Sequence, residues 1–180
     1  MTRKLGAGCV LFILLGATGL ARGQAQGERG AQQFAEFGDF KLQSGVVIHD
    51  FRLGYRTLGA LNAEKSNAIL WPTWLGGDSQ KLLQFAEPGN VADTRKYFVV
   101  MVDAIGDGVS SSPSNSKTQA RLKFPEFTIR DMVEAERRLA TEVLGLKHLR
   151  AVVGVSMGGM QTFEWAVAYP DFMDVVVPMM

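Results

Sequence analysis

The stretch AVVGVSMGGMQTFEWAVAYPD, Ala151 to Asp171, decides the fold of this chain. The apolar, β-branched run Ala151 to Val155 predicts a strand buried on both faces of a parallel sheet. The residues from Gly158 to about Tyr169 predict a helix, which a proline then ends. Between them GVSMG, Gly154 to Gly158, fits the pattern G-x-S-x-G. Between a strand and a helix, this pattern is typical of a sharp turn that exposes its serine above the sheet.

Ser156 is therefore the candidate nucleophile. The flanking glycines let the backbone segments around such a turn approach each other closely. The helix that begins at Gly158 directs its first N–H groups toward the serine, where they would stabilise negative charge on a substrate oxygen. The alternative is a glycine-rich turn in which the serine has no chemical role.

The segments before and after this motif predict an α/β fold. Two more buried strands are expected at residues 68–71 and 97–102, and a further apolar strand begins at residue 175. A helix is expected over residues 128–145, with Thr128 and Asp131 as an N-cap pair and Gly145 as its stop. Strands alternating with helices predict a mainly parallel sheet flanked by helices.

The first part of the domain has a different hydrophobic pattern. Alternating apolar residues from Val47 to Tyr55, followed by the turn-rich segment 59–67, predict a half-buried antiparallel strand pair. His49 falls on the apolar face in this pattern. Residues 24–36, rich in Gln, Gly and Ala, predict a flexible leader, so the domain is expected to occupy residues 37–180.

Residues 1–23 have the pattern of a secretory signal peptide. Arg3 and Lys4 precede an apolar and small-residue stretch, which polar and small residues follow. The stretch is short for a membrane span, which favours cleavage near Gly23 or Ala25 over an uncleaved anchor. Cys9 precedes the main apolar run, whereas a lipid-attachment cysteine would follow it. We therefore expect an exported protein, periplasmic or secreted, without a stable membrane anchor.

The composition excludes several function classes. Of 19 basic and 18 acidic residues, residues 1–23 hold three basic and no acidic ones, so 16 basic residues face 18 acidic ones in the remainder. This balance gives no electrostatic basis for binding nucleic acid. Cys9 is the only cysteine, and the two histidines share no metal-ligand spacing, so we expect no metal and no cofactor.

An acyl-transfer site also needs a second oxyanion donor, normally a backbone N–H after an earlier strand. The loop WPTWLGGDS, Trp71 to Ser79, follows the strand at 68–71. We nominate the amide of Leu75, or that of Trp74, to act beside the amide of Met157. The two tryptophans either pack or line an acyl pocket. Asp103 and Asp107 follow the strand at 97–102 and are either further site residues or ordinary loop residues.

Four segments resemble the homoserine O-acetyltransferase family of α/β-hydrolases, in order along the chain. They are LQSGVVIHDFRLGYRTLGALNAEKSNAILW (42–71), LGGDS (75–79), FPEFTIRDMVEAERRLATEVLGL (124–146) and GVSMGGMQTFEWAVAYPD (154–171). The resemblance implies an α/β-hydrolase fold and a small-molecule ester or acyl donor as substrate. It implies Ser156 as nucleophile and the amides of Leu75 and Met157 as the oxyanion hole, with a covalent acyl-enzyme on the serine.

Two departures from the family lie beside the acyl group. The family commonly has a His-Ala pair where this chain has Thr73 and Trp74, and a Gln where it has Met157. Both acyltransfer to an alcohol acceptor and esterase-like hydrolysis, with water as acceptor, are therefore expected possibilities. Export favours the hydrolase, because homoserine and acetyl-CoA are cytoplasmic metabolites.

The general base of such an enzyme is not recognisable in the sequence. The triad of this fold runs Ser, then Asp or Glu, then His, but the 24 residues after Ser156 contain no histidine. The acids after it are Glu164, Asp171 and Asp174. His148 precedes the strand at 151–155, on the far side of the sheet from Ser156, and His49 lies on an early strand.

These observations predict the N-terminal portion of an α/β-hydrolase, truncated after the nucleophile helix and the start of the next strand. The 180-residue chain alone is then expected to be inactive, because a serine without a base is a poor nucleophile. The alternative is a degenerate, non-catalytic relative that acts as a binding protein.

Overall fold

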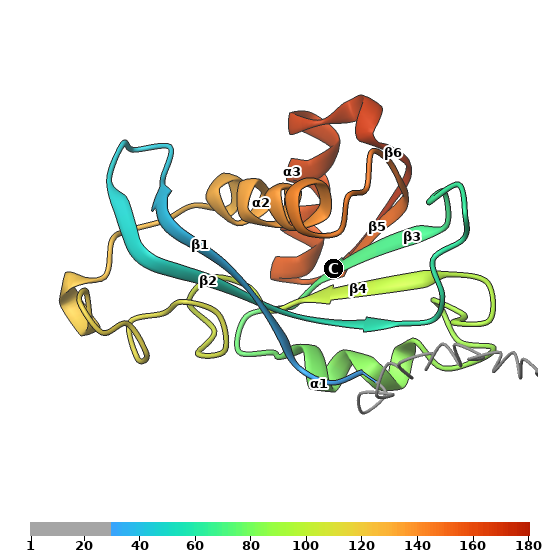
Figure 1. Cartoon of the computed structure of the whole chain (residues 1–180), viewed down its shortest axis with the longest axis horizontal. Helices are drawn as coiled ribbons and strands as arrows, with labels where there is room; N and C mark the ends of the chain where they lie inside the picture. Colours follow the sequence, from blue (N-terminus) through green and yellow to red (C-terminus); the bar gives the residue numbers. More distant parts are fainter. Residues whose placement is uncertain (1–29) are drawn as a thin grey trace, which may run out of the picture.

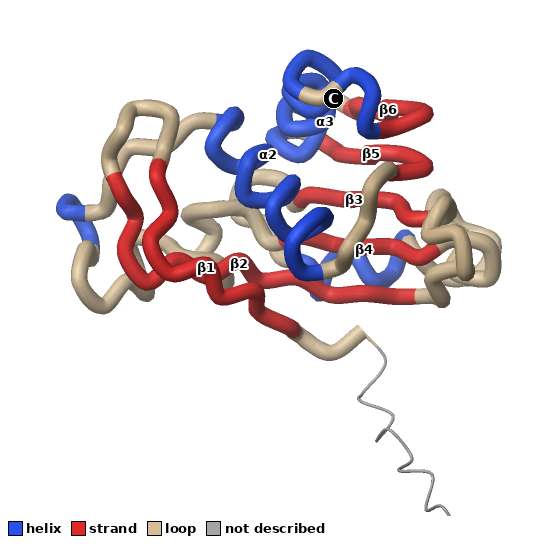
Figure 2. Tube along the Cα trace, turned by 45° about the horizontal axis from the view of Figure 1, so that its top comes forward, coloured by secondary structure: helices blue, strands red, loops and turns tan. Residues whose placement is uncertain are grey.

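Six strands form one sheet, in the order β1-β2-β4-β3-β5-β6, in the computed structural model, which describes residues 30–180. Neighbours from β4 through β3 and β5 to β6 are parallel, whereas β1 and β2 add an antiparallel pair at one side (Figure 2). The strands are β1 Gln33–Lys41, β2 Val47–Leu58, β3 Ala68–Pro72, β4 Phe98–Val102, β5 Leu149–Val155 and β6 Met173–Met179. The predicted mainly parallel sheet is confirmed.

Helices cover both faces of this sheet. Figure 1 shows α2 (Ile129–Arg138) and α3 (Met157–Ala168) on one face and the short α1 (Ser79–Leu82) on the other. Short 3-10 turns complete the connections at Leu83–Phe85, Arg121–Lys123 and Pro170–Phe172. The predicted layer arrangement, a sheet flanked by helices, is therefore present.

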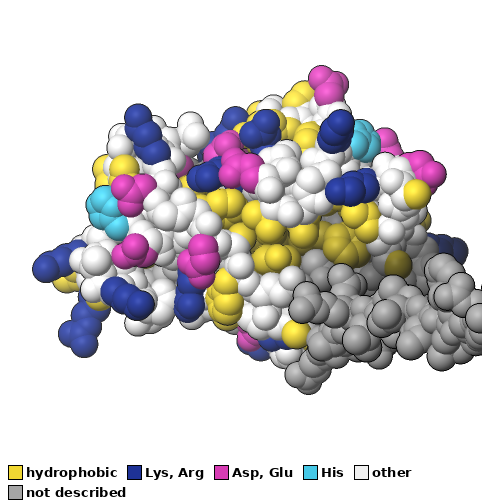
Figure 3. All heavy atoms as spheres, in the orientation of Figure 1, with side chains coloured by type: hydrophobic (Ala, Val, Ile, Leu, Met, Phe, Trp, Pro, Cys, Tyr) yellow, Lys and Arg dark blue, Asp and Glu magenta, His cyan; other side chains and the backbone are white. Residues whose placement is uncertain are grey.

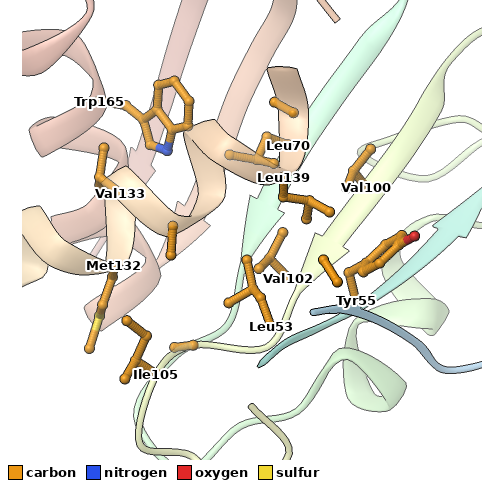
Figure 4. Packing of buried hydrophobic residues seen from close by; sticks show 14 of the residues in the cluster. Leu53, Tyr55, Leu70, Val100, Val102, Ile105, Met132, Val133, Leu139 and Trp165 are labelled. Carbon is orange, nitrogen blue, oxygen red and sulfur yellow. The ribbon is translucent and has the colours of Figure 1, made fainter. Parts of the chain in front are cut away.

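The larger core lies between the sheet and the pair α2 and α3. Figure 4 shows Trp165 and Val133 of the helices facing Leu70 and Val100 of the sheet, and all four are fully buried. Burial of one such side chain stabilises a fold by about 1.5–3 kcal/mol. A second cluster, which includes Trp71 and Leu82, packs on the α1 face. On the molecular face in Figure 3, a hydrophobic area lies near the centre, with charged side chains above it and to its left.

Helix α2 starts where the sequence predicts and ends earlier. Thr128 and Asp131 form a capping box, in which each side chain accepts a hydrogen bond from the other residue's N–H. The predicted helix over 128–145 is regular only as far as Arg138. Residues Leu139–Val143 form a π-helical turn, whose extra residue shifts the helical stripe and leaves Val143 45% exposed. Gly145 then stops the segment with φ +62°.

Strand β1 corrects the predicted leader. Gln33 is the Cα partner of Tyr55 on β2, so the last four residues of the expected leader 24–36 belong to the sheet. Ladder pairing and the burial of Ala35 outweigh the polar composition that favoured a flexible segment. The predicted signal peptide, residues 1–23, lies outside the described residues.

Candidate functional site

Ser156 is the single residue between β5 and α3. Its φ and ψ are +55° and −121°, a conformation that a non-glycine residue adopts only when its surroundings impose it. The Ser156 N–H donates to the carbonyl of Met179 on β6 at 2.9 Å, and its carbonyl accepts from the N–H of Met160 at 3.0 Å. The serine is exposed at the carboxyl edge of the sheet. The expected sharp turn with an exposed serine is therefore present in this structure.

Glycines make this turn possible. A Cβ atom at Gly154 would lie 2.1 Å from the carbonyl oxygen of Gly158, and one at Gly158 would lie 2.6 Å from that of Pro72. A Cβ at Gly159 would lie 2.6 Å from the carbonyl oxygen of Met179. Backbone atoms that close leave no room for a side chain, so the elbow requires glycine at all three positions.

The loop after β3 packs against the start of α3. The Gln161 side chain is fully buried, and its Nε2 donates to the carbonyl of Thr73 at 3.1 Å and to that of Met157 at 3.3 Å. Thr73 is also fixed to the end of β4, because its N–H donates to Val102 and its hydroxyl accepts from the N–H of Ala104. Gln161 was not predicted as a site residue, although its place in SMGGMQ, one helical turn after Met157, was a signal in the sequence.

The two segments that carry the nominated oxyanion donors thus follow β3 and β5, which are neighbouring strands. Met157 opens α3 directly after Ser156, and Leu75, which is 80% exposed, lies in the turn after β3. The N–H of Gly77 closes this turn by donating to the carbonyl of Trp74 at 2.8 Å. Their roles as oxyanion donors stay predictions, which the arrangement of the two segments supports.

The two tryptophans of this loop have packing contacts. Trp71 is 2% exposed, and its ring lies 6.1 Å from that of Phe85, which is the geometry of a core residue. Trp74 packs against the same α1-face cluster and covers Gly77. These contacts favour the packing interpretation for Trp71.

Asp103 is fully buried in a structural network. It accepts from the N–H and the hydroxyl of Ser79 at 2.6 and 2.9 Å, and from Gln32 Nε2 at 2.9 Å. These bonds fix the start of α1 to the end of β4, and none of them involves Ser156. The ordinary interpretation of Asp103 as a loop residue is the one that its contacts support.

Asp107 lies beside the loop of the candidate site. Its carboxyl accepts from the N–H groups of Val109 and Ser110 at 2.9 and 3.3 Å, and the Thr73 hydroxyl lies 3.5 Å away. Burial raises the pKa of Asp107 to about 7, and the charge of Asp103 contributes in the same direction, while the Val109 N–H opposes the shift. A group that titrates near neutral pH therefore borders Thr73.

His148 lies at the opposite end of the sheet from Ser156. Its Nε2 is 2.8 Å from Asp174 Oδ1, and Arg150 donates to the other oxygen of that carboxylate at 2.8 Å. The hydrogen bond from His148, together with that from Arg150, lowers the pKa of Asp174. The seven residues of β5 separate His148 from Ser156, which lie eight residue steps apart, about 26 Å of extended chain. The far-side placement predicted for His148 agrees with this position.

His49 does not lie on the apolar face, which corrects the expectation. Its side chain is 52% exposed and contacts the carboxylate of Asp39 at 2.8 Å. Two residues, His49 and Asp50, point outward between the buried Ile48 and Phe51, because the ladder with β1 shifts register here. Asp50 has φ +52° at this irregularity.

Within residues 30–180, no base contacts the candidate nucleophile: the Ser156 hydroxyl has no hydrogen-bond partner, and both histidines pair elsewhere. Glu164 pairs with Arg130 at 3.1 Å, and Asp171 lies in the turn before β6. The described residues also contain no group of three or more His, Cys, Asp and Glu side chains placed to hold a metal ion. No helix in that part of the chain has the length and apolar character needed to cross a membrane.

Comparisons with known proteins agree with this geometry. Residues 69–179 match the model of the alpha/beta hydrolase fold family. An ethyl acetate hydrolase of Pseudomonas veronii is 44% identical over 147 residues, which cover 79% of this chain and 42% of that protein. A homoserine O-acetyltransferase of Methanococcoides burtonii is 39% identical over 158 residues, covering 78% of this chain and 32% of that protein.

The crystal structure of an acetylester hydrolase from Corynebacterium glutamicum superposes with a TM-score of 0.79 at 41% identity. The superposition covers 82% of this chain and 43% of that one. The chain thus spans less than half the length of these relatives.

Proposed function

Because this chain belongs to the α/β-hydrolase fold family, we propose that it carries the nucleophile of a serine-dependent acyl-transfer enzyme. The observation that carries the proposal is the conformation of Ser156, alone between β5 and α3 with φ +55° and exposed. A strained non-glycine residue at a strand end is typical of a functional site. The substrate class is a small-molecule ester or other acyl donor.

In the first half-reaction, the Ser156 oxygen forms a bond to the acyl carbon, and the carbonyl electron pair moves onto its oxygen. The amides of Met157 and Leu75 donate hydrogen bonds to this oxyanion, which is most negative in the transition state. The intermediate collapses when the bond to the leaving oxygen breaks. The proton of the serine passes through a general base to that oxygen, so an alcohol leaves and an acyl-enzyme remains.

In the second half-reaction, an acceptor oxygen attacks the acyl-enzyme and restores the serine. Water as acceptor gives a carboxylic acid, and an alcohol acceptor gives a new ester. We propose hydrolysis as the main reaction. The identity of 44% to an ethyl acetate hydrolase, against 39% to a homoserine O-acetyltransferase, supports hydrolysis, and transfer to an alcohol acceptor is the alternative.

The proposal assigns the general base and its acidic partner to residues outside these 180. Residues 30–180 place neither histidine beside Ser156, and an unassisted serine keeps its proton near neutral pH. We therefore propose that the 180-residue chain alone is inactive and that the activity belongs to a full-length protein. We also propose export of that protein, on the signal-peptide pattern of residues 1–23.

The test uses the full-length protein and a fluorophosphonate, which reacts with activated serines. We expect one label, located at Ser156 by peptide mass spectrometry, and no label on Ser156→Ala. An unlabelled but folded wild type would overturn the catalytic proposal and leave the non-catalytic binding relative. Release of acid from p-nitrophenyl acetate in water alone identifies a hydrolase, whereas turnover that needs an added alcohol identifies a transferase.

A further inference from the structure

We propose that Gln161 is a positioning residue that fixes the spacing between the two backbone segments of the oxyanion hole. This inference rests on the proposed function. Gln161 lies on α3, is fully buried, and donates from one nitrogen to the carbonyls of Thr73 and Met157. Met157 is itself a nominated donor residue, and Thr73 lies two residues before the other, Leu75.

The sheet alone does not set this spacing. The register between β3 and β5 comprises Ile69 with Ala151 and Leu70 with Val152. Beyond that point the two strands continue to Pro72 and Val155 without pairing to each other, and the candidate donors follow. A cross-link after the last pair is needed to hold the two segments at a defined distance.

Gln161 supplies that cross-link from the helix side. Thr73 is already fixed to β4 by its N–H bond to Val102 and by the N–H of Ala104, which bonds to the Thr73 hydroxyl. Within residues 30–180, the bond from Gln161 to Thr73 at 3.1 Å is the hydrogen bond that joins α3 to the loop over 73–78. The close approach of Gly158 to Pro72 adds steric contact at the same place.

The amide of Gln161 is a poor choice for stability alone. Its Oε1 is buried and has no hydrogen-bond partner among the described residues. A buried oxygen without a partner is unfavourable, and an apolar side chain of the same shape would avoid it. Met in place of Gln keeps the length and volume and removes the unpaired oxygen, but it also removes both N–H bonds and leaves the buried Thr73 carbonyl without its donor. Fold stability and catalysis are therefore expected to respond differently to this substitution.

Loss of the Gln161 hydrogen bonds should weaken transition-state stabilisation more than substrate binding. Oxyanion donors act at 2.7–3.1 Å from the developing charge, so a small displacement of one segment weakens that stabilisation more than substrate binding. A positioning role therefore predicts a loss in kcat with little change in KM. It also predicts slower fluorophosphonate labelling of Ser156, because the reagent's phosphoryl oxygen develops negative charge at the same place.

The experiment compares Gln161→Met with Thr162→Val in the full-length protein. Thr162 is the matched control, because it is fully buried on the same helix but its hydroxyl bonds at 2.9 Å to Gly158 within α3. For Gln161→Met we expect a thermal midpoint close to that of wild type, because removal of the unpaired Oε1 offsets the loss of the donor to the Thr73 carbonyl. We expect a kcat for p-nitrophenyl acetate lower by about tenfold to a hundredfold. KM should stay within about twofold, and Thr162→Val should keep its kcat.

A Gln161→Met protein with wild-type kcat and labelling rate would overturn the inference while leaving the proposed function intact. If both variants lose kcat in proportion to the fall in their thermal midpoints, the effect is purely structural, and the inference is overturned as well. Gln161→Leu serves if Gln161→Met does not fold, with the same expectation. A wild type that is not labelled at Ser156 would instead overturn the proposed function, and this inference with it.

Discussion

The indole N–H of Trp165 donates a hydrogen bond of 2.6 Å to Glu136 Oε2, which links α3 to α2 inside the core. Glu136 is 1% exposed, and its other oxygen has no hydrogen-bond partner in the described part of the chain. Burial raises the pKa of Glu136 to about 8 from 4.5, against the opposing effect of the Trp165 bond. The core therefore favours a protonated carboxyl group.

We predict that this carboxyl group makes stability depend on pH. The folded-state pKa lies above that of the unfolded chain, so the stabilisation is complete below about pH 4.5 and declines as the pH rises to about 8. Each unit of separation corresponds to about 1.4 kcal/mol. Thermal midpoints from pH 5 to 9 should fall for the wild type and less for Glu136→Gln, which keeps an acceptor for the indole. The decline that remains is expected from Asp107, whose pKa burial also raises.

Glu142→Gln is the matched control, since Glu142 is exposed and Arg138 lowers its pKa. It should follow the wild-type decline. If the thermal midpoints of the wild type and Glu136→Gln fall in parallel with pH, a group other than Glu136 causes the decline.

Asp107 is predicted to titrate near neutral pH. Burial is the main cause of its raised pKa of about 7, and the charge of Asp103 adds to it. In a carboxyl-labelled protein, one carbon-13 signal should shift with a midpoint near pH 7 and be absent from Asp107→Asn. Removal of the nearby hydroxyl in Thr73→Val should raise the midpoint further, because that group favours the charged form. A midpoint near pH 4 would contradict the burial of this carboxyl group.

Gly154 should tolerate no side chain. In Gly154→Ala the new Cβ meets the carbonyl oxygen of Gly158 at 2.1 Å, so we expect a loss of about 3 kcal/mol or more in the free energy of unfolding. Gly76→Ala is the control, because its Cβ meets nothing within 4 Å and only the φ of +71° opposes it. That control should lose about 1 kcal/mol. Urea unfolding measures both, and equal losses would contradict the steric account of the elbow.

His148 is predicted to have no role in catalysis, although it forms a His-Asp pair with Asp174. The pair lies at the amino end of β5, whereas Ser156 lies at the carboxyl end. His148→Gln in the full-length protein should therefore retain kcat/KM within about twofold, since removal of a general base costs at least about a hundredfold. A loss of that larger size would identify His148 as the base.

The sequence predicted the central sheet well because each buried strand is a compact apolar run between turn residues. Ala68–Pro72 and Leu149–Val155 lie within two residues of their expected limits. The elbow was predictable because its glycines, two residues before and after Ser156, stand where the turn leaves no room for a side chain. The start of α2 was predictable from the capping pair Thr128 and Asp131.

Features that depend on tertiary contacts were not predictable. The position of His49 follows from a register shift between β1 and β2, which alternation alone does not contain. The polar residues at the start of β1 form a strand because their backbone pairs with β2. The link from Gln161 to Thr73 joins residues 88 positions apart, and a single sequence gives no measure of that proximity.

The hydrogen bond from the Ser156 N–H to Met179 has a consequence for folding during synthesis. The elbow backbone is closed by a residue of β6, and Gly159 packs on the same carbonyl. When Ser156 emerges from the ribosome during synthesis, β6, the strand that completes its turn, has therefore not yet emerged. The candidate nucleophile, Ser156, is therefore expected to acquire the backbone geometry described here only when β6 joins the sheet.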